Sequence, residues 1–93
     1  MPITPRNILR HELIGLPVKI VRSSNKNQVG IKGRVVDETY HTLVIETPKG
    51  EKRVEKKSCV FVFTLPDNTK VEVEGKLIVG RPEDRIKKKF PKW

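Results

Sequence analysis

The chain has 93 residues, a length that suits a single domain with one modest core. Its one cysteine cannot form an internal disulfide, and one cysteine with two histidines is too few ligands for a structural zinc site. Twenty lysines and arginines against eleven aspartates and glutamates give a formal charge of +9. This balance excludes an acidic, solvating chain and indicates a polyanionic partner.

The first predicted element is a short helix over residues 4–15, within an N-terminal helical extension of residues 1–15. Thr4 suits the N-cap, Pro5 the first helical position, where no backbone N–H is needed, and Gly15 the position just past the end. The helix either packs its apolar stripe on the chain's own barrel or docks a partner protein with it. The candidate docking residues are Ile8, Leu9, Arg10, Glu12 and Leu13.

Residues 16–80 are expected to form a small β-barrel, because short strands alternate with turn signals at intervals of about ten residues. The strand over 51–57 has a single apolar residue, Val54, and is expected at an exposed edge. The strand over 59–65 is apolar on both faces and is expected as a central strand. The predicted strands are 16–22, 29–38, 42–47, 51–57, 59–65, 70–74 and, after a break at Gly75, 76–79.

Apolar residues at alternating positions of these strands predict the core. Gly30 and Gly33 predict a bend or bulge of the kind that turns a corner in a small barrel. The acids are spread along the strands, mostly beside lysines, and are expected to face solvent. The predicted core comprises Ile20, Val35, Leu43, Ile45, Phe61, Val62, Phe63, Val71 and Val73.

Residues 81–93 are expected to form a basic C-terminal helix or tail. Pro82 suits the first position of a helix, and Pro91 would stop it. Six lysines and arginines stand against two acids, so this segment holds +4 of the total charge. A helix packed through Ile86 and Phe90 would turn its cations outward, where they either contact phosphates or only keep the protein soluble.

Two groups of cations are candidate RNA-binding residues. One group lies on the tail, and the other lies on the first two strands and their connection, which would gather its charges if those strands pair. Aromatic residues make up only 5% of the chain, too few for a protein that stacks successive bases. We therefore expect contacts to the phosphates of folded RNA. The candidates are Lys19, Arg22, Lys26, Lys32, Arg34, Arg81, Arg85, Lys87, Lys88, Lys89 and Lys92.

A catalytic site is not predicted. The two histidines, His11 and His41, lie on different elements, and the sequence holds no phosphate-binding loop, nucleophile elbow or metal-ligand spacing. Cys59 begins an apolar strand and is expected to be a buried thiol rather than a nucleophile. No apolar run approaches the ~18 residues of a membrane span and no secretory signal is visible, so we expect a cytoplasmic protein with no membrane partner.

Five blocks of the sequence resemble one protein family. Asn7–Leu16 is similar to the opening of archaeal ribonuclease P protein component 1, and Gly80–Arg85 resembles its closing motif. Gly33–Thr39, Thr42–Ile45 and Phe61–Phe63 continue the similarity between these ends. The resemblance therefore covers nearly the whole chain, and its first and last blocks are the most specific.

The resemblance implies a mainly β protein, a small, strongly bent, antiparallel Sm-like barrel with short N- and C-terminal helical extensions. It implies an RNA-binding protein subunit of ribonuclease P, which supports the catalytic RNA in removing the 5′ leader of precursor tRNA and has no active site of its own. The implied partners are ribonuclease P RNA, precursor tRNA, a zinc-ribbon protein subunit and other protein subunits. Magnesium is expected in the RNA subunit, with no cofactor bound by this chain.

A generic Sm-like or SH3-like nucleic-acid-binding module, or a ribosomal protein, would show the same charge and the same strands. Such proteins would lack the two end blocks. Co-purification with a single structured RNA and a zinc-ribbon protein would distinguish the ribonuclease P subunit from these alternatives.

Overall fold

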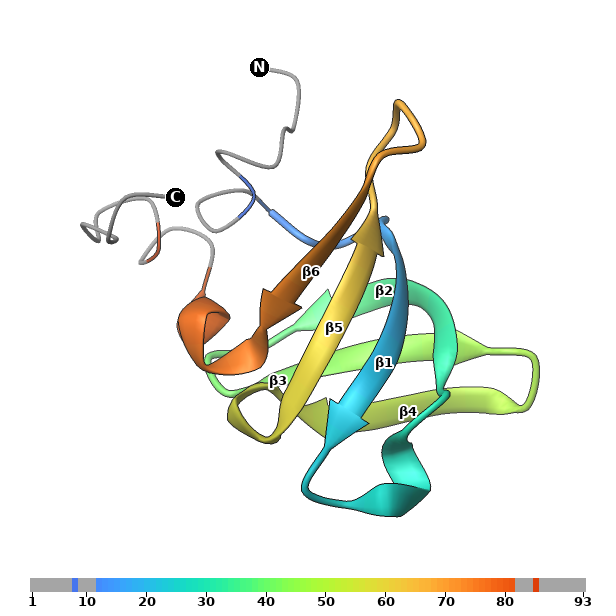
Figure 1. Ribbon diagram of the computed structural model, residues 1–93, viewed down its shortest axis with the longest axis vertical. Coiled ribbons are helices and arrows are strands. Elements are labelled where there is room, and N and C mark those ends of the chain that lie inside the picture. Colours follow the sequence, from blue (N-terminus) through green and yellow to red (C-terminus); the bar gives the residue numbers. More distant parts are fainter. Residues whose placement is uncertain (1–7, 9–11, 82–84, 86–93) are drawn as a thin grey trace.

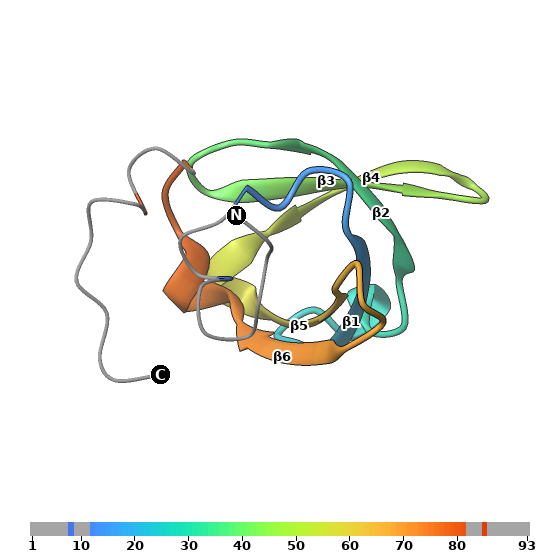
Figure 2. The same cartoon turned by 90° about the horizontal axis from the view of Figure 1, so that it is seen from above.

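Six antiparallel strands form one strongly bent sheet (Figures 1 and 2). The computed structural model describes Ile8, residues 12–81 and Arg85. In this part of the chain the strand order is β4-β3-β2-β1-β5-β6, and no pairing joins the edge strands β4 and β6, so the sheet is curled but not closed. The strands are β1 (Pro17–Ser23), β2 (Lys32–Glu38), β3 (Thr42–Thr47), β4 (Gly50–Glu55), β5 (Cys59–Thr64) and β6 (Lys70–Glu74).

The curl brings β1, β5 and β6 opposite β2, β3 and β4, with the core between the two halves (Figure 2). The register shifts between Ile20 and Arg22 in β1, where the strand pairs with β5, and between Val35 and Asp37 in β2, where it pairs with β3. Such bulges bend a strand and increase its twist. Gly33 also lets the strands approach closely, because a Cβ there would lie 1.9 Å from the carbonyl oxygen of Glu46.

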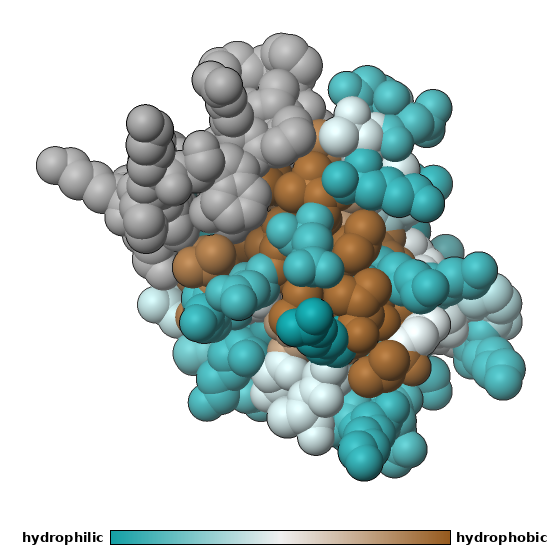
Figure 3. Space-filling model, in the orientation of Figure 1, coloured by the Kyte–Doolittle hydropathy of each residue, from teal (hydrophilic) through white to brown (hydrophobic). Residues whose placement is uncertain are grey.

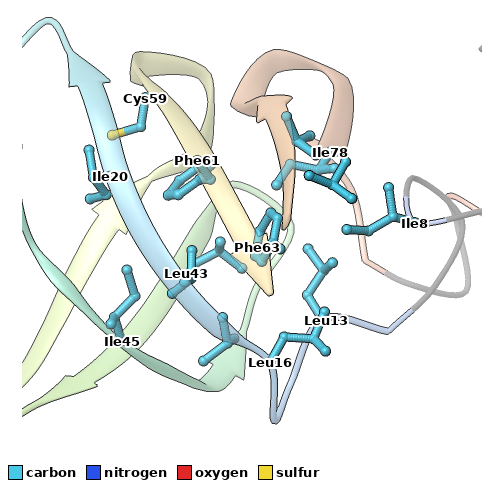
Figure 4. Packing of buried hydrophobic residues seen from close by; sticks show 14 of the residues in the cluster. Ile8, Leu13, Leu16, Ile20, Leu43, Ile45, Cys59, Phe61, Phe63 and Ile78 are labelled. Carbon is cyan, nitrogen blue, oxygen red and sulfur yellow. The ribbon is translucent and has the colours of Figure 1, made fainter. Parts of the chain in front are cut away.

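The core fills the inside of the curl (Figure 4). Phe61 and Phe63 of β5 are fully buried, with ring centroids 5.8 Å apart. The predicted core is confirmed with one exception, because Val62 points to the other face of β5 and is only half-buried. Ile8 and Leu13 also lie in this cluster, fully buried at its end. The core therefore joins the sheet to residues that precede it.

The predicted strands are confirmed within a few residues at each end, except for 76–79. That segment belongs to a 3₁₀ turn, η4 (Gly75–Ile78), because the chain crosses tightly against η3 (Lys56–Ser58), the 3₁₀ turn between β4 and β5. A Cβ on Gly75 would lie 1.6 Å from the carbonyl oxygen of Lys56. The predicted loop after β1 contains a third short turn, η2 (Lys26–Gln28).

The two expected helices lie outside the described residues except for Ile8, residues 12–15, Arg81 and Arg85. The expected helix does not extend to Gly15, because Glu12 and Leu13 are irregular and Ile14 and Gly15 form a turn, in which the Leu16 amide donates to the Leu13 carbonyl. Gly15 has a φ of +97° in this turn, and its amide donates to the Val35 carbonyl. The amide of Arg85 donates to the carbonyl of Arg81. No helix in the described part of the chain is long and apolar enough to cross a membrane.

Candidate nucleic-acid interface

Two adjoining open grooves collect exposed lysines. The larger, about 490 Å³ in volume, is lined by parts of β1, β2, β5 and β6 and carries Lys19, Lys32 and Lys70. The smaller, about 350 Å³, also reaches Lys32 and adds Lys49 and Lys52 from the β3–β4 hairpin. Every charged residue that lines the two grooves in the described structure is a lysine. We call the surface formed by Lys19, Lys32, Lys49, Lys52 and Lys70 the basic groove.

The register of β1 and β2 places Lys19 directly opposite Lys32. Like charges in this position destabilise a sheet, and both side chains are exposed. On its other side Lys19 pairs with Val62 of β5, so no carboxylate on the adjacent strands stands directly opposite it. The pair therefore forms a site of concentrated positive potential that an anion bound between the two ammonium groups would relieve.

Between its lysines the larger groove has a mostly apolar lining. Pro17, Val18 and Val62 contribute to it, together with Pro48 from the β3–β4 turn. Figure 3 shows an apolar surface over β5 and β1, surrounded by hydrophilic side chains. No aromatic side chain of the described residues lines either groove, so the surface favours phosphate and ribose contacts over base stacking.

Of the predicted RNA-binding residues, the structure brings Lys19 and Lys32 together in the basic groove. Arg22 is turned outward by the bulge in β1 and stands opposite Val60. Lys26 is exposed on η2. Arg34 is exposed, and it donates a 2.5 Å hydrogen bond to the carbonyl of Gly15, so it also holds the entry to β1. In the register of the sheet it stands opposite Glu46 of β3.

Arg81 is exposed next to Gly80, whose amide donates a 2.6 Å hydrogen bond to the carbonyl of Tyr40. It does not line the basic groove. The remaining tail candidates, Lys87, Lys88, Lys89 and Lys92, lie outside the described residues. Three lysines of the basic groove were missed by sequence reasoning, since only the strand order brings them together: Lys49, Lys52 and Lys70.

Arg85 lies inside the protein, which corrects the prediction that it contacts RNA. Its side chain is fully buried and donates from Nη1 to Glu38 Oε2 and from Nη2 to Glu38 Oε1, the latter at 3.5 Å. Lys56, the first residue of η3, is also fully buried, and its Nζ donates to the same Glu38 Oε2 at 2.7 Å. We call Glu38, Lys56 and Arg85 the buried ion cluster.

Backbone carbonyls complete the buried ion cluster. Lys56 Nζ donates to the carbonyls of Thr39 and Gly80 at 2.8 Å, and Arg85 Nη1 donates to the Gly80 carbonyl at 2.8 Å. The cluster thus ties the β2–β3 turn, η3 and the chain after η4 to one point. Every buried side-chain nitrogen and oxygen of the described residues has a hydrogen-bond partner.

One of these three residues, Lys56, carried a signal in the sequence. Lys56 is two residues after Val54, the inward-facing residue of the edge strand, so alternation places it inward as well. Glu38 faces inward only because the bulge in β2 reverses the alternation after Val35; it then pairs with the buried Leu43. The expectation that the acids face solvent is therefore wrong for Glu38.

The chain matches the family model of the ribonuclease P/MRP p29 subunit over residues 6–88. It belongs to this family. It is 59% identical over 89 residues to ribonuclease P protein component 1 of Methanocaldococcus jannaschii, covering 95% of this chain and 93% of that protein. It is 52% identical over 90 residues to the protein of the same name from Methanosphaera stadtmanae, covering 97% of each.

A solved structure described as Mth11, a homologue of human RNase P protein Rpp29, shares the fold with a TM-score of 0.59. It is 52% identical to this chain and matches 82% of this chain and 99% of its own length. The family and the bent antiparallel fold implied by the resemblance in the sequence are thus confirmed.

Part of the predicted docking face is buried inside the protein. Ile8 and Leu13 are fully buried in the core, so the structure gives both side chains to the chain's own packing rather than to a partner. Glu12 is exposed, whereas Leu9 and Arg10 lie outside the described residues.

The thiol of Cys59 faces the interior of this p29-family fold. It is almost fully buried, and burial raises its pKa above the usual range, although a hydrogen bond with Ser23 works in the opposite direction. A raised pKa leaves little thiolate at neutral pH, which argues against a nucleophilic role. In the described residues no three His, Cys, Asp or Glu side chains gather as metal ligands would.

Proposed function

We propose that this chain is the RNA-binding protein subunit of ribonuclease P and supports a catalytic RNA in removing the 5′ leader of precursor tRNA. Its membership of the p29 family, and the name ribonuclease P protein component 1 carried by its relatives, support this role. The observation that carries RNA binding is the basic groove, where Lys19 and Lys32 face each other without a lining carboxylate.

The basic groove binds the sugar–phosphate backbone of folded RNA. Its lysines replace counterions condensed on the RNA, so affinity falls as salt rises. A second set of phosphate contacts comes from three lysines of the C-terminal segment, Lys87, Lys88 and Lys89. Further phosphate contacts come from Arg22, Lys26, Arg34, Arg81 and Lys92.

The test is a pair of charge-matched double variants. One variant, Lys19→Gln with Lys32→Gln, removes two cations from the basic groove. The control, Lys57→Gln with Lys76→Gln, removes two cations outside the groove, whose side chains are 70% and 69% exposed. Binding to a ribonuclease P RNA transcript is measured against salt concentration. The groove variant is expected to lower the log–log slope by roughly 1–2 units, and the control by much less. Equal changes in both variants would mean that only net charge matters.

Catalysis belongs to the RNA subunit and its magnesium ions, and this chain binds no cofactor. The purified protein is therefore expected to leave precursor tRNA intact. Together with the RNA and the other protein subunits, it lowers the magnesium needed for cleavage, because its cations offset part of the phosphate repulsion that magnesium otherwise screens. Cleavage by a nuclease-free preparation of the protein alone would contradict this assignment.

In the assembled enzyme the chain also contacts precursor tRNA, a zinc-ribbon protein subunit and other protein subunits, in the cytoplasm. The exposed apolar side chains Ile14, Val29 and Tyr40, each between 43% and 48% exposed, are available to a protein partner. Co-purification of the native protein with a single structured RNA and a zinc-ribbon protein is the expected result. Recovery with ribosomal particles instead would count against the proposal.

A further inference from the structure

The turn between β2 and β3 carries the one pair of aromatic rings that is exposed among the described residues. Tyr40 is 44% exposed, and the neighbouring His41 is exposed as well. Their ring centroids lie 4.7 Å apart, and the ring planes are inclined at 65°. An edge-to-face pair of this kind does not cover every ring face, as a larger parallel stack would. The two rings therefore form a corner of aromatic surface that solvent reaches.

Hydrogen bonds from η3 and from the chain after η4 hold the backbone of this turn (Figure 1). The carbonyl of Tyr40 accepts from the amide of Gly80 at 2.6 Å, and the carbonyl of His41 accepts from the amide of Lys56 at 2.8 Å. Nζ of the same lysine, in the buried ion cluster, donates to the carbonyl of Thr39 at 2.8 Å. The support of the two rings is thus fixed before a ligand arrives, which reduces the entropy lost on binding.

The residues beside the aromatic pair are polar. Thr39 and Thr42 flank it, with their hydroxyl oxygens 2.6 Å apart. Glu55 of β4 stands opposite Thr42, and its carboxylate is 3.7 Å from the ammonium of Lys57. Arg81 is exposed one residue after the glycine whose amide binds the turn. The core of a protein interface is largely apolar, whereas a nucleobase combines an aromatic face with polar edges, so these surroundings suit a nucleobase.

The position of the pair separates it from the basic groove. It lies at one end of β3, and the β3–β4 turn, which brings Lys49 to the groove, lies at the other. A strand of this length spans about 20 Å, so the two surfaces make distinct contacts. Bases inside an RNA helix are stacked on each other, and only bases in loops, bulges and ends have faces free for a side chain. One aromatic pair has room for one such base.

We propose that Tyr40 and His41 bind one unpaired nucleobase of the partner RNA, which stacks on a ring of the pair while Arg81 contacts a neighbouring phosphate. This inference rests on the proposed function and adds a base contact to the phosphate contacts of the basic groove. Phosphate contacts alone carry little information about the RNA, whereas this site distinguishes an RNA with an unpaired nucleotide from a continuous helix.

The test compares an RNA hairpin that has a single bulged adenosine with the same hairpin fully paired. The ratio of the two affinities, measured with the full chain at one salt concentration, gives the preference for the unpaired base. Tyr40→Leu removes the aromatic ring and keeps an apolar side chain, whereas Tyr40→Phe keeps the ring. Lys19→Gln is the comparison variant, because it removes a cation of the basic groove. Circular dichroism establishes that each variant is folded at the assay temperature.

The unchanged protein is expected to prefer the bulged hairpin by about tenfold, a factor that stacking of one base on an aromatic side chain provides. Tyr40→Leu should lose most of this preference and bind the paired hairpin almost as before. Tyr40→Phe should keep the preference. Lys19→Gln should weaken binding to both hairpins by a similar factor, because it acts on phosphate contacts that the two RNAs share.

A spectroscopic measurement locates the base directly. Tyr40 is the only tyrosine in the chain, so its ring protons give an unambiguous NMR signal. They are expected to shift upfield when the bulged hairpin is added and to move much less with the paired hairpin or with inorganic polyphosphate. Equal shifts with polyphosphate would show that the ring responds to bound charge rather than to a base, and would overturn the proposal.

The affinities separate failure of this proposal from failure of the proposed function. If Tyr40→Leu keeps the preference for the bulged hairpin, the aromatic pair does not bind the base, although RNA binding itself stands. If Tyr40→Leu leaves both affinities unchanged but weakens binding to another protein subunit of ribonuclease P, the pair is a protein contact and the proposal is wrong. If the unchanged protein binds neither the hairpins nor a ribonuclease P RNA transcript, the proposed function fails and this inference fails with it.

Discussion

Lysine and arginine serve two opposite purposes in this protein. In the buried ion cluster, Lys56 and Arg85 are fully buried around Glu38, and backbone carbonyls accept further hydrogen bonds from both. In the basic groove, Lys19 and Lys32 are exposed opposite each other, with no acid among the described residues that line the groove. Inside, one carboxylate and backbone carbonyls bind both cations. Outside, no acid of the groove lining faces the lysines, and we propose that RNA does.

The difference shows that positive charge alone does not identify a binding residue. The cations of the buried ion cluster stabilise one arrangement of the chain, and removing them damages the fold. In the basic groove, Lys19 and Lys32 stand opposite each other, so removing one of them is expected to stabilise the fold and, on the proposed function, to weaken RNA binding. Four predictions test this opposition, beginning with the largest effect.

Replacing the shared carboxylate is expected to have the largest effect. Glu38→Gln leaves Lys56 and Arg85 buried without their common anion, which should lower the free energy of unfolding by about 3–5 kcal/mol. The matched control is Asp37→Asn, at the neighbouring exposed carboxylate. Urea unfolding followed by circular dichroism measures both. Similar small losses in the two variants would show that water reaches the cluster and screens it.

The neighbouring lysines Lys56 and Lys57 offer a direct comparison of the two environments. Lys56→Met removes hydrogen bonds to Glu38 and to buried carbonyls and should cost about 1.5–3 kcal/mol. Lys57 is 70% exposed, in a 3.7 Å surface pair with Glu55, so Lys57→Met should change stability by less than ~0.5 kcal/mol. Thermal unfolding of both proteins provides the measurement, and a greater loss for Lys57→Met would contradict the assignment.

Removing a lysine from the basic groove should raise the stability of the fold rather than lower it. Lys32→Gln removes one member of the opposed pair and is expected to raise the free energy of unfolding by about 0.2–1 kcal/mol at low salt. The gain should shrink as salt screens the repulsion. Lys70→Gln is the control, because Lys70 stands opposite Thr64 rather than a cation. A loss of stability that is insensitive to salt would show that Lys32 contributes packing rather than repulsion.

The smallest effect concerns the thiol of Cys59, which reports on opening of the sheet. Burial raises its pKa, so less thiolate is present at a given pH than for a free cysteine, and alkylation by iodoacetamide at about pH 8 should be slow. The rate should rise as pH approaches the raised pKa. If the buried ion cluster holds only its own end of the fold, Glu38→Gln should leave this rate nearly unchanged under native conditions. A large acceleration would mean that the cluster holds the whole sheet.

Much of the fold could be predicted from local patterns. Apolar and polar patterning, together with the turn signals between segments, located all six strands, and the single apolar residue of the edge strand, Val54, marked its place. The prediction of a strand over 76–79 was wrong. The chain turns there because Gly75 lies against the carbonyl of Lys56, a residue far away in sequence. Local alternation carries no information about such a contact.

The candidate site was only half visible in the sequence. Lys19 and Lys32 were candidates that would come together if their strands paired, and the strands do pair. Lys49, Lys52 and Lys70 join them only through the curl of the sheet.

By itself, the sequence determined the class of fold, the positions of the strands, the excess of positive charge and, through its end blocks, the family. These properties depend on residue type and local spacing. Alternation from Val54 indicated that Lys56 is internal, but the tertiary structure alone decided that Glu38 and Arg85 are internal with it. A single bulge in β2 turns Glu38 inward, where it meets Lys56 and Arg85, while the bulge in β1 turns Arg22 outward. Because one extra residue reverses the alternation of a strand, the same charged side chain can stabilise the core or face a partner, and only the three-dimensional pairing of the strands fixes which.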